Sequence, residues 1–201
     1  MLSVSDLSGS RGERTLFSGL NFDLAPGQWL QVSGANGVGK TSLLRMLVGL
    51  SAPDSGTICW KNQPIGDQSD DYRAALLYLG HLCGLKDELT PLENLQLAQA
   101  LDGYPVDEGT ALAALARMGL RGREHLPVRV LSAGQKRRTV QARLLLRPAS
   151  LWVLDEPFSA LDGAGVQLLC GLIEGHLQAG GLAVLTSHQS IPMQGGRELA
   201  L

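Results

Sequence analysis

The chain has 201 residues, of which 44% are hydrophobic and 18% are charged, and its formal net charge is -2. This length and composition suit one globular domain with a packed core and exclude an intrinsically disordered chain. The slightly acidic balance argues against a nucleic-acid partner, because proteins that bind nucleic acid usually carry a basic face.

The N-terminal segment has neither the basic start nor the apolar run of a secretory signal. No stretch approaches the roughly 20 apolar residues that a membrane-spanning helix needs. The three cysteines, Cys59, Cys83 and Cys170, form no CxxC pair and are expected to be reduced thiols. We therefore expect a soluble cytosolic protein that reaches a membrane only through a partner.

Strand and helix patterns alternate along the chain and are interrupted by a helical block. In chain order they predict strands at 20–24 and 29–33, a helix at 41–50, strands at 55–60 and 75–79, helices at 91–101, 110–119 and 135–146, a strand at 150–154, a helix at 165–177, and strands at 182–186 and 197–201. Thr90 is placed to cap the first helix of the block. This order favours one α/β domain over residues 1–201, with a helical subdomain inserted at 82–147.

The glycine-rich segment between the second strand and the first helix matches the phosphate-loop pattern G-x-x-x-x-G-K-[ST]. It reads Gly34-Ala35-Asn36-Gly37-Val38-Gly39-Lys40-Thr41. Its glycines allow successive backbone N–H groups to surround phosphate oxygens, and the following helix directs its positive end at the same charge. Lys40 is expected to reach the β- and γ-phosphates of ATP, and the Thr41 hydroxyl to ligate Mg²⁺. An ordinary glycine turn would not explain the strand before it and the helix after it.

Two carboxylates follow the apolar run Leu151-Trp152-Val153-Leu154. Asp155 stands where a phosphate-loop enzyme needs an acid to hold Mg²⁺, and Glu156 is then the natural base for attack on the γ-phosphate. Alone, a strand that ends in Asp-Glu-Pro is as typical of a turn with a helix cap. The phosphate loop upstream favours the catalytic interpretation.

The segment Leu131-Ser132-Ala133-Gly134-Gln135 has the chemistry of a second anion cradle at the start of a helix. Without the other motifs it would be read as a capped helix with a solvated basic first turn. After the phosphate loop and before the two carboxylates, it resembles the signature LSGGQ of ABC transporter nucleotide-binding subunits, with alanine for the first glycine. The resemblance implies a P-loop NTPase of ABC type, with a RecA-like core, an N-terminal antiparallel β part and the helical insertion.

The same resemblance assigns further roles. Thr186-Ser187-His188 matches the family's switch histidine, which contacts the γ-phosphate, although a lone histidine after a strand is more often a surface residue. Family members sandwich two ATP molecules between two cassettes, so a homodimer is implied, with Ser132 and Gly134 acting on the partner's ATP. The expected catalytic residues are Lys40, Glu156 and His188, and the expected Mg²⁺ residues are Thr41, Asp155 and His81. The expected nucleotide-binding residues are Arg11, Gly34, Ala35, Asn36, Gly37, Val38, Gly39, Lys40, Thr41, Ser42, Ser132, Gly134 and Gln135.

Two positions depart from the ABC pattern. His81 stands where the family has a glutamine that contacts Mg²⁺ and signals to the membrane subunit, and a neutral imidazole cannot reproduce an amide. Near the N-terminus, where an aromatic side chain usually stacks on adenine, the segment Gly9-Ser10-Arg11-Gly12 has none. Arg11 is our candidate for this stacking, through its planar guanidinium.

Within the ABC family, the runs Tyr78-Leu79-Gly80-His81 and Glu93-Asn94-Leu95 are similar to CcmA, the ATPase family of bacterial cytochrome c maturation. This resemblance implies a peripheral dimer on the cytoplasmic face of the inner membrane, bound to an integral membrane partner of CcmB type and to further maturation subunits. It also implies ATP-driven haem export or release of the haem chaperone. The segment from His81 to Glu93 is expected to face the membrane subunit, unless it is only the solvated entry to the insertion.

Other functions remain open at this point. A different membrane transporter would use the same motifs. A soluble ABC ATPase acting on DNA or ribosomes usually has two cassettes or long coiled-coil insertions, and this chain has neither. A phosphate-loop kinase would leave the signature and His188 without a purpose. A regulator that binds nucleotide without turnover would often lack the base at Glu156.

Overall fold

The computed structural model describes residues 1–66, 69–188 and 191–201, which form two compact units. The first unit comprises Met1–His81, Ala149–Pro157 and Ile173–Leu201. The second unit comprises Leu82–Pro148 and Phe158–Leu172, so it takes in a segment beyond the insertion expected at 82–147. Within the described residues, no helix has both the length and the apolar character needed to cross a membrane.

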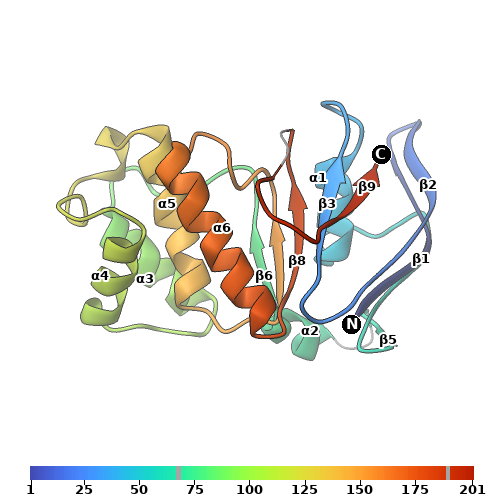
Figure 1. Ribbon diagram of the computed structural model, residues 1–201, viewed down its shortest axis with the longest axis horizontal. Coiled ribbons are helices and arrows are strands. Elements are labelled where there is room, and N and C mark those ends of the chain that lie inside the picture. The colour runs from blue at the N-terminus through green and yellow to red at the C-terminus, as the bar shows by residue number, and fades with distance from the viewer. Residues whose placement is uncertain (67–68, 189–190) are drawn as a thin grey trace. The chain divides into compact units, whose positions relative to one another are not determined.

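A parallel sheet forms the centre of the first unit. Among the described residues its order is β6 (Leu76–Leu79), β7 (Leu151–Leu154), β8 (Leu182–Thr186), β3 (Trp29–Ser33) and β9 (Arg197–Ala200). Every residue of β7 and β8 is buried, as expected for inner strands of a parallel sheet that is covered on both faces. Figure 1 labels β6, β8, β3 and β9 of this sheet, and β7 lies between β6 and β8. Because the strands are parallel, their carboxyl ends meet at one edge, where α/β proteins place ligands.

An antiparallel sheet completes the first unit, in the order β2 (Arg14–Leu24), β1 (Leu2–Arg11), β4 (Ser55–Trp60) and β5 (Gln63–Pro64). Strand β1 was not predicted from the sequence, and its backbone explains why. Asp6 has a left-handed conformation with φ 49°, and the pairing register shifts between Val4 and Leu7. This irregularity breaks the alternation of apolar and polar residues that reveals a strand.

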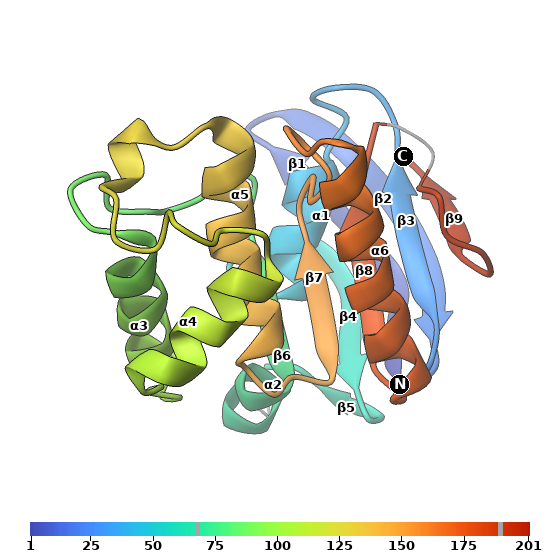
Figure 2. The same ribbon diagram turned by 60° about the vertical axis from the view of Figure 1, so that its left-hand side comes forward.

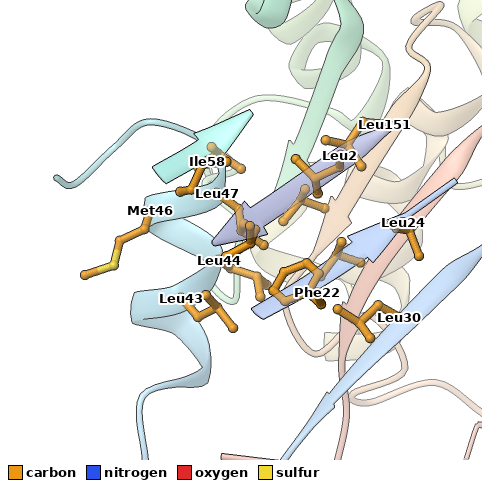
Figure 3. Close-up of a cluster of buried hydrophobic side chains, with 14 of the residues drawn as sticks. Leu2, Phe22, Leu24, Leu30, Leu43, Leu44, Met46, Leu47, Ile58 and Leu151 are labelled. Carbon is orange, nitrogen blue, oxygen red and sulfur yellow. The ribbon is translucent and has the colours of Figure 1, made fainter. Parts of the chain in front are cut away.

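Helix α1 (Lys40–Leu47) buries Leu43, Leu44 and Leu47 completely. Figure 3 shows its side chains meeting those of the strands, in a cluster that includes Leu2 and Phe22. The short helix α2 (Ser69–Ala75) contributes Tyr72 to the same core. The Tyr72 hydroxyl donates a 2.5 Å hydrogen bond to Leu47 O at the end of α1. The phosphate-loop helix is therefore held along its length by apolar packing.

Helices dominate the second unit: α3 (Pro91–Leu101), α4 (Glu108–Arg117) and α5 (Ala133–Gln141), with the 3-10 turns η1 (Val128–Val130) and η2 (Ala142–Leu145). Figure 2 shows α3 and α4 next to each other, and buried Leu95, Leu115 and Met118 belong to their shared core. Thr90 caps α3 in a capping box with Glu93, as predicted, and Asp107 caps α4. The last helix, α6 (Gly163–Gln178), contributes residues to both units.

The predicted elements are found with shifted ends. The strand predicted at 75–79 begins one residue later, because Ala75 ends helix α2. The helix predicted at 135–146 begins at Ala133 and changes to a 3-10 turn after Gln141. The helix predicted at 110–119 begins two residues earlier, after the Asp107 cap. Helix ends are set by capping and by tertiary contacts, which hydrophobic periodicity does not report.

Candidate functional site

The loop between β3 and α1 has a backbone that glycine alone adopts easily. Gly34, Gly37 and Gly39 have φ of 139°, 79° and 127°. A Cβ on Gly34 would lie 3.0 Å from Leu201 O and 3.0 Å from Val38 Cγ1. On Gly39 it would lie 3.0 Å from the Cβ of Leu16. Side chains at these points would distort the loop, so the glycines maintain its shape.

Lys40 begins α1 and is 7% exposed. Its Nζ donates hydrogen bonds of 2.7 Å to Gly34 O and 3.1 Å to Ala35 O, so the ammonium group lies against the loop that precedes it. The N–H groups in the first turn of α1 have no earlier carbonyl within the helix to bond. A buried ammonium group and a free helix N-terminus together form a strong site for an anion.

At the end of β7, Asp155 is 1% exposed and accepts hydrogen bonds on both carboxylate oxygens. The Thr41 hydroxyl donates to Oδ2 at 2.8 Å, and the Thr186 hydroxyl donates to Oδ1 at 2.7 Å. These bonds connect the first turn of α1 to the ends of β7 and β8. An acid held between two hydroxyls, one of them beside the anion site, offers oxygen atoms of the kind that Mg²⁺ prefers.

The neighbouring carboxylate, Glu156, has a left-handed backbone with φ 51°. Its N–H donates a 2.7 Å hydrogen bond to the Thr186 hydroxyl, and its Oε1 lies 3.0 Å from Nε2 of His188. The side chain of Glu156 is 16% exposed and that of His188 is 43% exposed, so the pair stands at the edge of the interior. A carboxylate in this position can accept a proton from a water molecule in the adjoining cavity.

A cavity of about 280 Å³ lies over the phosphate loop within the first unit. It is small for a ligand pocket, since such pockets usually have about 300–1,000 Å³. Most predicted residues of the core site line it: Arg11, Asn36, Gly37, Gly39, Lys40, Thr41, Ser42, His81, Glu156 and His188. Among the other predicted residues, Asp155 is tied to the lining through Thr41, and Gly34 and Ala35 offer their carbonyls to Lys40.

Two residues that sequence reasoning missed also belong to this region. Leu16, on β2, lines the cavity and packs against Gly39. Thr186, at the end of β8, bonds to both carboxylate residues. A sequence signal existed for Thr186, because a hydroxyl at the carboxyl end of an otherwise apolar strand needs a buried partner. No sequence signal existed for Leu16. The alternation of apolar and polar residues in a strand does not show which cavity or segment its side chains contact.

The predicted signature residues belong to the second unit. Ser132 caps α5: its Oγ accepts from Gln135 N at 3.2 Å, and Gln135 Oε1 accepts from Ser132 N at 2.9 Å. A Cβ on Gly134 would lie 2.6 Å from the backbone oxygen of Ala160, so only glycine fits there. Within the second unit, this segment is therefore the capped start of α5, and its backbone at Gly134 lies close to the backbone of Ala160.

The family model described as ABC transporter matches residues 17–159 of the chain. Together with the parallel sheet, the phosphate loop and the paired carboxylates, this match defines the class of protein, an ATP-binding cassette of ABC type. The structure resembles a putative ABC transporter ATP-binding protein from Pyrococcus furiosus with a TM-score of 0.86, at 22% identity, over 100% of this chain and 96% of that one.

Proteins similar in sequence identify a narrower family within this class. The Cytochrome c biogenesis ATP-binding export protein CcmA of Dechloromonas aromatica is 53% identical, over 100% of both chains. The protein of the same name from Methylococcus capsulatus is also 53% identical, over 96% of this chain and 94% of the relative. The chain therefore belongs to the ABC transporter family and, within it, to the CcmA family of cytochrome c biogenesis ATP-binding export proteins. The predictions of fold and family are confirmed.

Proposed function

We propose that the chain binds and hydrolyses ATP as the energy-supplying subunit of an ABC transporter in cytochrome c biogenesis. The observation that carries the proposal is the meeting of four side chains, Lys40, Thr41, Glu156 and His188, around one cavity over the phosphate loop. These side chains supply a phosphate-binding cation, a metal-binding hydroxyl, a base and a polar partner for the base. The transporter acts in haem export or in release of the haem chaperone.

The loop holds the phosphate chain of ATP through the backbone N–H groups of residues 34–42 and the ammonium group of Lys40. The residues present also fit Mg²⁺, because Thr41 and Asp155 bring two hard oxygen donors to the side of the cavity. Thr41 gives its hydroxyl hydrogen to Asp155, so an oxygen lone pair would remain to hold Mg²⁺. When bound there, Mg²⁺ would neutralise negative charge on the phosphate chain of ATP.

In the hydrolysis step, Glu156 accepts a proton from a water molecule as the water oxygen bonds to the γ-phosphorus. The bond from that phosphorus to the β,γ-bridging oxygen breaks, and ADP leaves with the bond's electron pair. His188 orients the Glu156 carboxylate from 3.0 Å away and contacts the γ-phosphate. Lys40 stabilises the charge on the phosphate oxygens throughout the step.

Three further lining residues contribute to this scheme. His81 lines the cavity at the position where the family has a glutamine, and a ring nitrogen without a hydrogen would accept a hydrogen bond from a water molecule on Mg²⁺. Arg11 and Leu16 come from the two strands of the N-terminal hairpin and form the wall beyond the loop. Arg11 stacks its guanidinium plane on the adenine ring.

A second copy of the chain completes the site. Ser132, Gly134 and Gln135 of one copy close over the γ-phosphate bound by the other, which makes the protein a homodimer with two shared ATP sites. The small volume of the cavity supports this arrangement, since about 280 Å³ leaves much of a nucleotide triphosphate uncovered. The helical segment 82–147 acts as the subdomain that presents these residues.

The dimer is peripheral and sits on the cytoplasmic face of the bacterial inner membrane. Its partner is an integral membrane subunit of CcmB type, and further cytochrome c maturation subunits complete the complex. Two exposed leucines, Leu82 and Leu101, are suited to a protein contact. Nucleic acid is not a partner, in keeping with the net charge of -2.

The decisive experiment for hydrolysis is Glu156→Gln. The amide cannot accept the proton, so steady ATP turnover should fall by roughly 100-fold or more while an ATP-bound dimer accumulates. Turnover is measured by phosphate release and the dimer by size-exclusion chromatography with ATP. Wild-type turnover in the variant would remove Glu156 from the role of base.

The role in cytochrome c biogenesis is tested separately in cells. Deleting the gene should abolish staining for covalent haem in c-type cytochromes, and a plasmid copy of the wild-type gene should restore it. The Glu156→Gln gene should not restore it. Normal c-type cytochromes in the deletion strain would refute the biogenesis role and leave the ATPase role in place.

A further inference from the structure

Thr186 ends strand β8, and its hydroxyl joins the two carboxylate residues of the site. The side chain is fully buried. Its Oγ1 donates to Asp155 Oδ1 at 2.7 Å and accepts from Glu156 N at 2.7 Å. A threonine hydroxyl has one hydrogen and two lone pairs, a carboxylate accepts, and an amide N–H donates. Both bonds therefore have the polarity that the chemistry requires.

The rest of β8 does not call for a hydroxyl. The other residues of the strand, Leu182, Ala183, Val184 and Leu185, are apolar and buried. Valine has the shape of threonine and an equal preference for strands, so the strand would form with valine at position 186. A buried hydroxyl is unfavourable unless it is bonded. Its two partners, Asp155 and Glu156, directly follow the neighbouring strand β7 and are therefore the reason for threonine at this point.

The bond to Glu156 N acts on a strained part of the backbone. Glu156 has φ 51°, a left-handed conformation that residues other than glycine rarely adopt. The Thr186 hydroxyl satisfies the Glu156 N–H in that conformation, and the turn directs Oε1 toward Nε2 of His188. Losing the hydroxyl would leave the backbone turn with one restraint fewer.

The bond to Asp155 acts on the other half of the site. Asp155 receives one hydroxyl from Thr41 on Oδ2 and one from Thr186 on Oδ1, so its plane is fixed from both sides. The single oxygen of Thr186 thus sets the orientation of Asp155 and the backbone of Glu156 together. The metal-holding acid and the base keep a constant relative position.

We propose that Thr186 is a positioning residue for ATP hydrolysis. It holds Glu156 and Asp155 in a fixed position relative to each other and does not touch the nucleotide. The proposal rests on the ATPase function proposed above. It predicts a loss of catalytic rate without a comparable loss of ATP binding, because the phosphate loop and Lys40 do not depend on this hydroxyl.

The test compares Thr186→Val, which removes the hydroxyl at constant shape, with Thr186→Ser, which keeps it. The full chain is assayed together with its membrane partner for kcat, for the Kd of MgATP and for thermal unfolding. Thr186→Val should lower kcat on the order of 10- to 100-fold, since small displacements of catalytic groups have effects of this size. Its Kd should change less than about 3-fold, and Thr186→Ser should return kcat to within about 3-fold of the wild type.

Tyr72→Phe is the matched control for stability. It also removes one buried hydroxyl with a backbone partner, Leu47 O, but it does not touch Asp155 or Glu156. Its unfolding temperature should fall while kcat stays near the wild-type value. If Thr186→Val does not fold, Thr186→Cys replaces it, and its weakly bonding thiol should give a kcat clearly below that of Thr186→Ser.

A double variant tests whether Thr186 affects the hydrolysis rate through Glu156. In a Glu156→Gln background, Thr186→Val should lower the residual single-turnover rate much less than it does alone, because the base through which it acts is already lost. Equal effects in the two backgrounds, a wild-type kcat in Thr186→Val, or a Thr186→Ser variant as slow as Thr186→Val would overturn the proposal. An inactive wild-type complex that does not bind ATP would instead refute the ATPase function.

Discussion

The imidazole of His176 lies flat on the indole of Trp152, with ring centroids 3.9 Å apart and planes 4° from parallel. Its Nε2 lies 3.1 Å from Leu182 O, and a Cβ on Gly181 would lie 2.2 Å from the ring. Burial lowers the pKa of His176 below its ordinary value of 6.5, against a smaller opposing effect of the bond to Leu182 O. The folded protein therefore favours the neutral ring, which donates its Nε2 hydrogen to Leu182 O.

This contact predicts a dependence of stability on pH. Below pH 6.5 the unfolded chain binds a proton on His176 more readily than the folded chain does, so the free energy of unfolding falls as the pH falls through that range. His176→Phe keeps the stacking and removes the titration. Its free energy of unfolding should decrease less between about pH 7.5 and about pH 5.5 than that of the wild type.

Urea denaturation of the full chain at both pH values measures this difference. His125→Gln, which changes an exposed histidine of the second unit, is the control and should keep the wild-type pH dependence. If His176→Phe lost as much stability on acidification as the wild type does, His176 would have no part in the effect.

A second prediction concerns His81, which lines the cavity beside Lys40 and Thr41. His81→Ala should reduce stimulation of ATP hydrolysis by the membrane partner more than it reduces ATP binding, because the phosphate loop remains intact. His81→Gln restores the family's amide and should recover stimulation. ATPase rates with and without the partner, beside the Kd of MgATP, measure both quantities. Equal losses of stimulation and binding would show that His81 only supports the nucleotide site.

A third prediction concerns the nucleobase. If the guanidinium of Arg11 stacks on adenine, Arg11→Ala should weaken ATP binding by about 3- to 10-fold, since an exposed contact of this kind contributes about 1 kcal/mol. Arg11→Lys keeps the charge but loses the plane, so it should resemble alanine, whereas Arg11→Tyr should bind at least as tightly as the wild type. Competition binding with ATP and with inorganic triphosphate separates the contribution of stacking on adenine from that of charge attraction to the phosphates. Wild-type affinity in Arg11→Lys would mean that Arg11 acts through charge alone.

The shared ATP site is tested by mixing two inactive variants. Lys40→Ala removes the cation of one half-site, and Ser132→Arg blocks the other half of the site. Neither homodimer should hydrolyse ATP, but a mixed dimer contains one intact site. Random mixing in equal amounts should restore about a quarter of wild-type activity, because half of the dimers are mixed and each has one of two sites. Absence of recovery, with dimers still formed, would mean that each chain works on its own ATP.

Several features of the protein follow from local sequence. The phosphate loop occupies eight consecutive residues, Gly34 to Thr41, and its backbone is determined by glycines whose φ angles lie outside the range of other residues. Capping of α3 by Thr90 is equally local, because the cap and its partner Glu93 are three residues apart. Such features depend on sterics and hydrogen bonds within one or two turns of the chain, which a sequence displays directly.

Strand β1, in contrast, could not be predicted from local sequence. Its register shift near Asp6 removes the alternation that would have revealed it, and only pairing with β2 and β4 makes it a strand. Leu16 reaches the cavity through the same sheet. Strand pairing is a long-range property, because it depends on partners that are far away in the sequence.

The chemical groups of the site can be identified from the amino-acid sequence: a phosphate loop, a lysine, two adjacent carboxylates and a histidine. Which of these groups contact one another depends on how the whole chain folds. Thr41 and Asp155 are 114 residues apart, and Thr186 and Asp155 are 31 apart. They meet because the order of strands in the parallel sheet places β7 and β8 together and directs their carboxyl ends toward α1. That order is set by packing of the whole core, and no short stretch of sequence contains it.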